Sequence, residues 1–338
     1  MTIREIAEKA GVSTATVSRM INENGFVSDE AREKILKAFK ETGYDPSQRK
    51  RRKSIPPALL KHSNVVVIWT VGKHYEQSPT GQSLMMGINE ALQKMDASLT
   101  LTHIYANEDL PPSLLNGKFD GVLITGKTPS PAVCNFLKNV PTVWLLQQGP
   151  ADFGDRVQPN HALAGEIACD WLVQQNCKNL CCMSYRELIT QHHYAQTRAE
   201  NFLNQAEQNR IPGTLLTYTE PRESAGIVAD RAKAAADLVK QLIQLDPRPD
   251  GLFVANELGP FVHPELLQNG IVPMKDIQMV AGDDNICSQY LLDPKPATIR
   301  IFSQQIGQQA VEMLLQRIKN PDMPQLTCAL KPQLIVPA

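Results

Sequence analysis

Apolar residues recur at helical spacing in three short stretches at the start of the chain. The pattern predicts a first helix that Gly11 ends, a second helix over 14–22, and a third that begins at Ser28 or Asp29. Ser13 is placed to cap the second helix through its hydroxyl. The inward-facing positions expected for the three helices are Ile3, Ile6, Ala7 and Ala10, then Val17, Met20 and Ile21, then Ala31, Ile35, Leu36 and Phe39. The sequence therefore predicts a small all-α head.

The first two helices are joined by a tight Gly-Val-Ser turn, which is the helix-turn-helix arrangement. In that arrangement the second helix lies in the major groove of DNA with its N-terminal residues at the base edges. Thr14, Ala15 and Arg19 leave the apolar face and are the expected base readers, because Arg bonds guanine with two donors and small side chains touch the thymine methyl. The other residues expected to contact DNA, mainly its phosphates, are Ser13, Thr16, Ser18 and Asn22. A surface helical hairpin without DNA contact is the alternative.

Beyond residue 63 the pattern alternates between continuous apolar runs, typical of buried parallel strands, and amphipathic stretches. We expect strands at 65–71, 98–104, 121–125, 141–146, 179–184, 215–219, 251–255 and 277–281, and helices at 82–95, 194–208 and 229–245. Repeated strand–helix units favour doubly wound parallel sheets, and about 275 residues are too many for one such sheet. The predicted fold is an all-α helix-turn-helix head plus an α/β core of two doubly wound parallel-sheet lobes. A ligand is expected between the lobes, beyond the carboxyl ends of the strands.

Charge is distributed unevenly along the 338 residues, although the net charge is only −1. Residues 1–61 hold 13 Lys and Arg against 8 Asp and Glu, whereas the rest holds 21 against 27. A basic head before an acidic body points to a nucleic-acid or membrane-surface contact at the head. Five consecutive cations occupy 49–53, and the Pro-Pro pair that follows breaks regular structure, so we expect a linker over 47–63. Its expected DNA contacts are Arg49, Arg51, Arg52 and Ile55, and a flexible solvated charge run is the alternative.

Composition and motifs narrow the function. The chain has no run of eighteen apolar residues and no apolar leader after its first methionine, so we expect a cytoplasmic protein. The seven cysteines are scattered, which favours reduced thiols used as small hydrophobes. The adjacent pairs His192–His193 and Cys181–Cys182 lack the spacing of metal sites, and no catalytic or dinucleotide motif is present. We therefore predict no enzyme activity, no cofactor and no metal.

The stretch from Ile3 to Asn22, IREIAEKAGVSTATVSRMIN, resembles the N-terminal signature of the lactose-repressor/galactose-repressor (LacI/GalR) family of bacterial transcription regulators. The segments VSDEAREKI at 27–35 and GYDP at 43–46 fit the same pattern. Weaker similarity to the family's periplasmic-binding-protein-like core follows at 119–124, 252–257, 276–284, 296–299 and 306–318. The resemblance thus covers nearly the whole chain.

The resemblance implies how the chain is divided and where a small-molecule effector binds. It implies a DNA-binding domain over 1–46, a hinge over 47–63, a first lobe over 64–160 plus 292–320, and a second lobe over 161–291 plus 321–338. The chain would cross between lobes near 158–163, 290–296 and 319–324. By family position the effector-contacting residues are Arg198, Asn256 and Asp283, to which Thr80, Lys127, Gln147 and His192 are added. A structural ion pair between Arg198 and Asp283 is the alternative.

Several positions depart from the family's pattern. Glu257 stands where the family usually has Asp, and the loop 186–193 matches poorly. The leucine that the family inserts into the minor groove corresponds to about Lys53, which cannot act as an apolar wedge. Either Ile55 or Leu59 would replace it, or the linker would bind DNA mainly through phosphates. Trp144 lies inside a predicted strand and is expected in the core. These departures leave the effector open.

The predicted function is a repressor-type, sequence-specific transcription regulator. We expect a homodimer that reads a pseudo-palindromic operator in double-stranded DNA, since each head touches one half-site. Its operator affinity would be controlled by a small-molecule effector, favoured to be a carbohydrate, with a purine- or nucleoside-responsive regulator as an alternative. Two other classes stay open: a solute-binding module with a non-functional head, and an architectural DNA binder that tolerates any sequence.

Overall fold

The computed structural model describes residues 3–22, 27–42, 60–70, 78–104, 110–146, 152–185, 194–218, 227–282 and 291–337. The chain divides into two compact units, Met1–Ala58 and Leu59–Ala338. The predicted hinge over 47–63, with Arg49, Arg51, Arg52, Lys53 and Ile55, lies outside the described residues except for its last four positions.

The first unit contains the three predicted helices, α1 (Ile3–Ala10), α2 (Thr14–Asn22) and α3 (Asp29–Thr42). Their shared core consists of Ile6, Ala7, Ala10, Val17, Ile35, Ala38 and Phe39. The prediction for Leu36 is wrong, because this side chain is 46% exposed. Ile35, Ala38 and Phe39 follow the i, i+3, i+4 spacing of one helix face, and Leu36 is turned about 100° away from Ile35. Ala38 therefore takes the core position that the sequence assigned to Leu36.

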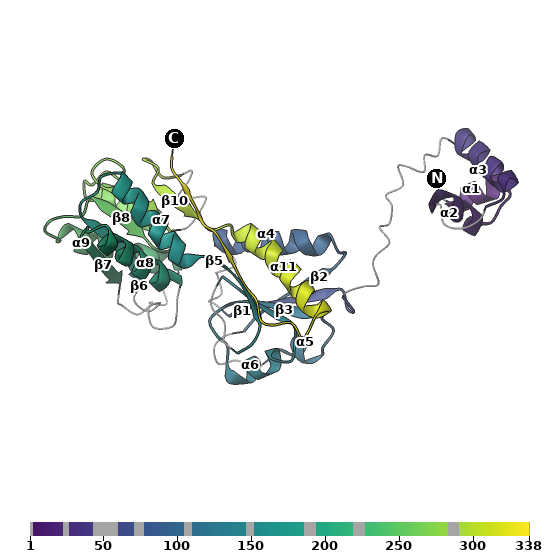
Figure 1. The fold of residues 1–338 in the computed structure, drawn as a ribbon, viewed down its shortest axis with the longest axis horizontal. Coiled ribbons are helices and arrows are strands. Elements are labelled where there is room, and N and C mark those ends of the chain that lie inside the picture. The colour runs from purple at the N-terminus through teal and green to yellow at the C-terminus, as the bar shows by residue number, and fades with distance from the viewer. Residues whose placement is uncertain are drawn as a thin grey trace. The chain divides into compact units, whose positions relative to one another are not determined.

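The second unit contains two six-stranded sheets, each the centre of one lobe (Figure 1). The first sheet has the order β11-β5-β4-β3-β1-β2, and the second has the order β12-β10-β9-β8-β6-β7. The strands of the first sheet are β1 (Asn64–Thr70), β2 (Ser98–His103), β3 (Gly121–Gly126), β4 (Thr142–Leu145), β5 (Asp155–Pro159) and β11 (Thr327–Leu330). Those of the second are β6 (Leu180–Tyr185), β7 (Gly213–Tyr218), β8 (Gly251–Val254), β9 (Gln278–Ala281), β10 (Ala297–Arg300) and β12 (Gln333–Ile335).

All strand pairs are parallel except β10 with β12. The helices of the first lobe are α4 (Pro79–Gln93), α5 (Pro112–Leu115), α6 (Pro131–Leu137) and α11 (Ser303–Lys319). Those of the second are α7 (His161–Gln174), α8 (Tyr194–Gln208), α9 (Ile227–Ile243) and α10 (Gly259–Gln268). Parallel strands covered on both faces are buried throughout, as β3 is along its whole length. The predicted fold class, a helix-turn-helix head with two parallel-sheet lobes, is confirmed.

Two glycines let helices pack closely on each lobe. A Cβ at Gly307 on α11 would run into the carbonyl of Leu84 on α4, and a Cβ at Gly165 on α7 would run into the carbonyl of Arg198 on α8. The same two helix pairs, α4 with α11 and α7 with α8, lie side by side in Figure 1. In each lobe a glycine therefore sets the distance between the two helices.

The chain crosses between the lobes at three places, two of which differ from the prediction. The first crossing lies between β5 and α7, inside the predicted range 158–163. The second lies at 301–302, not 290–296, because β10 pairs with β9 and β12 of the second sheet. The third lies at 331–332, not 319–324, because β11 pairs with β5 of the first sheet. Segments of three or four residues carry no signal of which sheet they join, so sequence reasoning misplaced both.

The remaining predictions about the core concern single residues. Trp144 is 2% exposed and packs edge-on against Phe153, which confirms it as a core residue. Six cysteines are free, and burial raises the pKa of Cys169 and Cys181 to about 12. These thiols act as small hydrophobes, as predicted, while Cys287 lies outside the described residues. Within the described part of the chain, no helix combines the length and apolar character that crossing a membrane requires.

Candidate functional site

The second helix of the head, α2, presents its predicted reading face to solvent. Thr14, Ala15 and Arg19 are exposed, whereas Val17 on the opposite face is fully buried. Ser13 caps the helix as predicted, because its Oγ accepts a hydrogen bond from the Thr16 amide at 3.1 Å. The core thus fixes which side of α2 is available to DNA.

The polar residues expected to contact phosphates are placed less uniformly. Ser13 is exposed, and its hydroxyl lies 2.8 Å from that of Thr16. Thr16 and Ser18 are half-buried at the edge of the reading face. The side chain of Asn22 lies outside the description, as do the hinge residues Arg49, Arg51, Arg52 and Ile55. The described part of the predicted DNA-contacting set therefore consists of Ser13 and five residues of α2, namely Thr14, Ala15, Thr16, Ser18 and Arg19.

The second candidate site lies at the carboxyl ends of β6, β8 and β9, which are neighbours in the second sheet. Met183 is in register with Val254, and Val254 with Ala281. The residues that follow these three positions therefore share one edge of the sheet. Ser184 and Asn256 are both buried there. In open α/β sheets this edge is the place where ligands bind.

Arg198 from α8 reaches over this edge. Its Nη1 donates hydrogen bonds to the carbonyl oxygens of Ala255 at 3.0 Å and Gly282 at 2.6 Å. The guanidinium also lies 4.9 Å from the ring centre of Tyr194, and the whole side chain is 1% exposed. Hydrogen bonds to an ionised group are about twice as strong as neutral ones, so the strand ends hold Arg198 firmly.

Arg198 has a further partner that sequence reasoning missed. Its Nε donates a hydrogen bond to Nδ1 of His161, at 3.3 Å. His161 is the first residue of α7 and lies 37 positions upstream, where the chain crosses between lobes. The only signal in the sequence is a polar residue directly after a predicted crossing, which does not identify its partner.

Two buried polar atoms at this edge have no hydrogen-bond partner. They are Nδ2 of Asn256 and Oγ of Ser184. The other end of the Asn256 amide is engaged, because Oδ1 accepts a hydrogen bond from the Leu258 amide at 3.2 Å. A buried donor or acceptor without a partner costs about 1–3 kcal/mol, so both atoms are suited to a polar ligand. Ser184 was missed, although a polar residue closing the apolar run LCCMS could have indicated it.

The departure at Glu257 has a structural explanation. Glu257 forms an ion pair with Arg231 in the first turns of α9, and both side chains are about one-fifth exposed. Its carboxylate is therefore engaged beside the candidate site and is balanced by a cation of the same lobe.

The structure brings together only part of the predicted effector set. Arg198 and Asn256 meet at the carboxyl edge of the second sheet, as the resemblance implied. Thr80, half-buried at the start of α4, and Lys127, exposed after β3, belong to the first lobe. Gln147, His192 and Asp283 lie outside the described residues, so the alternative ion pair between Arg198 and Asp283 stays untested.

Comparison with known proteins finds matches to the two regions of the chain that hold these candidate sites. Residues 2–47 match the description "Bacterial regulatory proteins, lacI family", and residues 169–336 match a periplasmic binding protein-like domain. The chain contains the helix-turn-helix domain of the LacI family. Its relatives include the ribose operon repressor of Escherichia coli K12, which is 26% identical over 99% of this chain and 98% of the relative. The PurR transcriptional repressor of Vibrio cholerae serotype O1 is 25% identical over 99% of this chain and 96% of the relative.

Several solved structures share the fold of this chain. The CelR–cellobiose complex has a TM-score of 0.65 at 18% identity and covers 99% of this chain and 98% of its own. A LacI-family regulator from Enterococcus faecium with bound ribose has a TM-score of 0.67 at 20% identity. The match covers 80% of this chain and 97% of the Enterococcus chain. The lac repressor dimer bound to operator has a TM-score of 0.63 at 18% identity. The match covers 99% of this chain and 98% of the lac repressor chain. The chain joins a LacI-family helix-turn-helix domain to a periplasmic binding protein-like domain, which is the composition of an effector-controlled, DNA-binding transcription regulator.

Proposed function

We propose that the protein represses transcription by binding a pseudo-palindromic operator as a homodimer. The observation that carries this proposal is the capped helix α2, whose exposed face holds Thr14, Ala15 and Arg19 above a fully buried Val17. One such head spans a single half-site, so two-fold pairing of heads matches a two-fold DNA sequence. The relative solved on its operator is a dimer by its description, which supports the same assembly here.

The proposed effector site is the carboxyl edge of β6, β8 and β9. Arg198 supplies a buried cation, while Asn256 and Ser184 each supply a buried polar atom without a partner. Such a set suits a small ligand with several hydroxyl groups, because hydroxyls both donate and accept. We therefore favour a sugar. The ribose operon repressors among the relatives and the neighbour with bound ribose support this choice.

A purine-type effector is the second candidate. The PurR repressors match this chain as closely as the ribose operon repressors do, at 25% and 26% identity. The amide of Asn256 can pair with a heterocyclic base as well as with a hydroxyl. The effector screen below therefore includes both chemical classes.

The proposed mechanism is a shift between two arrangements of the lobes. An effector can change operator affinity only if it binds one arrangement better than the other. The three crossings at the lobe boundary are the places where the backbone can absorb such a movement. The coupling is reciprocal: if the effector changes the affinity of the protein for its operator by a given factor, operator DNA changes the affinity for the effector by the same factor. The proposal includes no catalytic step.

Selection from random duplexes tests the DNA-binding part. The purified full chain is expected to recover a pseudo-palindrome. Arg19→Ala is expected to relax specificity at one base position, with a loss of about 1–3 kcal/mol there, because a bidentate arginine contact reads one base. Equal losses on all duplexes would contradict this role, and binding to every sequence with the same affinity would support the architectural alternative.

A thermal-shift screen tests the effector part. Ribose, cellobiose, hypoxanthine and guanine are added to the full chain, and a ligand at 100 times its Kd is expected to stabilise the protein by about 2.7 kcal/mol. Asn256→Asp is the matched variant, because it keeps an acceptor for the Leu258 amide but removes the Nδ2 donor. We expect it to lose the shift. An unchanged shift in this variant would place the effector elsewhere.

A further inference from the structure

His161 lies where the chain passes from the first lobe to the second. It is the first residue of α7 and follows Asn160, whose side chain caps that helix by accepting a hydrogen bond from the Leu163 amide at 3.1 Å. The amide of Asn160 donates in turn to the carbonyl of Leu330 on β11, at 2.8 Å. The backbone that leads into His161 is therefore fixed, and the His161 side chain is half-buried.

The two nitrogens of this ring contact different lobes. Nδ1 lies 3.3 Å from Nε of Arg198 in the second lobe, and Nε2 lies 3.2 Å from the carbonyl oxygen of Leu146, directly after β4 in the first lobe. A guanidinium can only donate, so Nδ1 must accept and carries no proton. In the neutral ring the proton then sits on Nε2, which donates to Leu146. One tautomer satisfies both contacts.

Both ends of this bridge are anchored. The amide of Leu146 donates to the carbonyl of Val157 on β5 at 2.9 Å, which ties the first end to the first sheet. Arg198 donates to Ala255 and Gly282, which ties the second end to β8 and β9. A chain of directed hydrogen bonds therefore runs from the carboxyl edge of the second sheet, through the imidazole, to the backbone of the first lobe. Tyr194 packs against this chain, its ring centre 5.5 Å from that of His161.

We propose that His161 is a positioning residue that couples Arg198 to the position of the first lobe. The inference rests on the proposed function, in which the edge holding Arg198 receives the effector. A ligand that draws Arg198 toward itself strains the bond to Nδ1, and a movement of the first lobe strains the bond from Nε2. Effector binding and movement of the first lobe therefore act on the two hydrogen bonds of the same imidazole. A change in one of these bonds alters the free energy of the other. His161 itself need not touch the ligand.

The first test separates ligand binding from the response to the ligand. The full-length variants are His161→Phe, which removes both contacts, and His161→Gln, whose amide can accept from Arg198 and donate to Leu146. The control is His263→Gln, which alters another buried histidine of the second lobe, bonded to the Pro294 carbonyl at 2.7 Å. Calorimetry gives the Kd for ribose, or for hypoxanthine if the screen selects it. Anisotropy gives the operator Kd with and without that ligand.

We expect His161→Phe to bind the ligand within about threefold of the unaltered protein while its ligand-induced change in operator affinity shrinks roughly tenfold, which is within the usual range of coupling between sites. His161→Gln should restore most of the response, and His263→Gln should leave it unchanged. A full response in His161→Phe would overturn the proposal. So would abolished ligand binding in a folded His161→Phe protein, since the ring would then be part of the binding site itself.

The second test needs neither ligand nor DNA. Long-range ¹H–¹⁵N spectra of the full chain labelled at histidine report which ring nitrogen is protonated, and the signals missing in His161→Gln identify His161. We expect the Nε2–H tautomer. A Nδ1–H or doubly protonated ring would overturn the bridge. If the tautomer is as expected but neither ribose nor hypoxanthine changes operator binding, the proposed function fails and the bridge is only structural, which also overturns the coupling role.

Discussion

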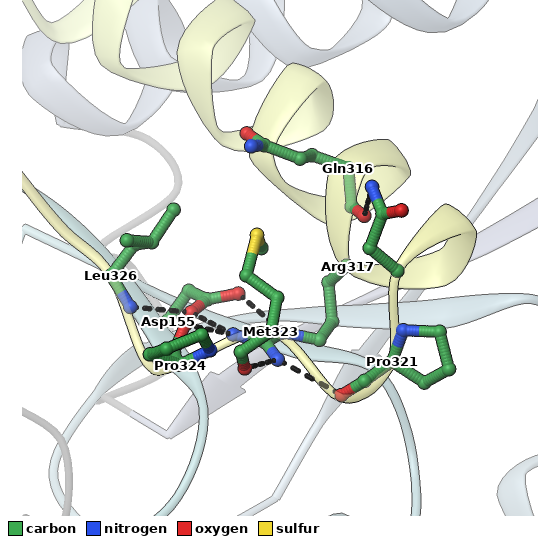
Figure 2. A network of polar contacts seen from close by, with 8 residues as sticks. Asp155, Gln316, Arg317, Pro321, Met323, Pro324 and Leu326 are labelled. Atoms are coloured by element: carbon green, nitrogen blue, oxygen red, sulfur yellow. Dashed lines mark hydrogen bonds and ion pairs between the residues drawn. The ribbon is translucent and has the colours of Figure 1, made fainter.

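Each lobe contains an arginine anchored at a sheet edge, buried Arg198 in the second and half-buried Arg317 in the first, and the two are held in different ways. Arg317, near the end of α11, binds the fully buried Asp155 through Nε at 2.9 Å and Nη2 at 2.7 Å (Figure 2). It also donates to three backbone carbonyls, those of Pro321, Met323 and Pro324. Arg198 instead donates to two backbone carbonyls and an imidazole, and its guanidinium lies against the ring of Tyr194.

The comparison separates an arginine that joins elements of one lobe from an arginine at the proposed effector site. Asp155 neutralises Arg317 and also accepts from the Leu326 amide at 2.8 Å, so the network joins α11, the segment after it and β5. The hydrogen bond to Asp155 raises the pKa of Arg317 above its usual value. Arg198 is held instead at the carboxyl edge of the second sheet, which is the proposed effector site, and its hydrogen bonds fix its position there. The two arginines therefore stabilise different parts of the fold.

The largest effect is expected from breaking the structural network. Arg317→Met leaves the Asp155 carboxylate buried without its cation and should lower the free energy of unfolding by about 3–5 kcal/mol. Urea unfolding followed by tryptophan fluorescence measures it, since Trp69 and Trp144 lie in the same lobe. The control is Lys138→Met, which removes the exposed pair with Asp152 and should change stability by less than about 1 kcal/mol. Equal losses in the two variants would show that Arg317 is only a surface contact.

The same comparison shows what the sequence can and cannot reveal. The cap at Ser13, the buried strands and the two-lobed core follow from local patterns, and these were predicted. Arg317 and Asp155 are 162 positions apart, and Arg198 and His161 are 37 apart. Contacts over such separations depend on how β5, α7 and α11 are joined across the lobe boundary. Arg317 and Asp155 were assigned to the same lobe and His161 to a predicted crossing, but such an assignment does not identify which side chains meet. Neither arginine's partner could therefore be predicted, although Arg198 itself was identified through the family resemblance.

An effect of intermediate size is expected at two matched glycines, one in each lobe, which test whether the environment of Arg198 differs from the corresponding place in the first lobe. A Cβ at Gly165 would clash with the carbonyl of Arg198 and would lie 2.9 Å from the amide nitrogen of Phe202. A Cβ at Gly307 would clash with the carbonyl of Leu84 and would lie 2.9 Å from the amide nitrogen of Ile88. Each substitution to Ala should therefore lower the free energy of unfolding by about 1–3 kcal/mol through overpacking. Only Gly165→Ala moves the backbone that carries Arg198, so only this variant should weaken the ligand-induced thermal shift. Equal weakening by Gly307→Ala would show that the shift reports general stability.

The smallest effect concerns two buried hydroxyls that lack partners. Oγ of Ser184 at the end of β6 and Oγ of Ser303 at the start of α11 are both buried and unpaired. Replacing either serine by Ala removes an unsatisfied group and should raise the free energy of unfolding of the ligand-free protein by up to about 1 kcal/mol. The two variants should differ once ligand is present, because Ser184 stands at the edge that Arg198 covers and Ser303 stands in the other lobe. Ser184→Ala should therefore weaken ligand binding while Ser303→Ala leaves it unchanged, as calorimetry would measure. Unaltered binding in Ser184→Ala would mean that its hydroxyl is a packing defect of the lobe and that Asn256 and Arg198 recognise the ligand without it.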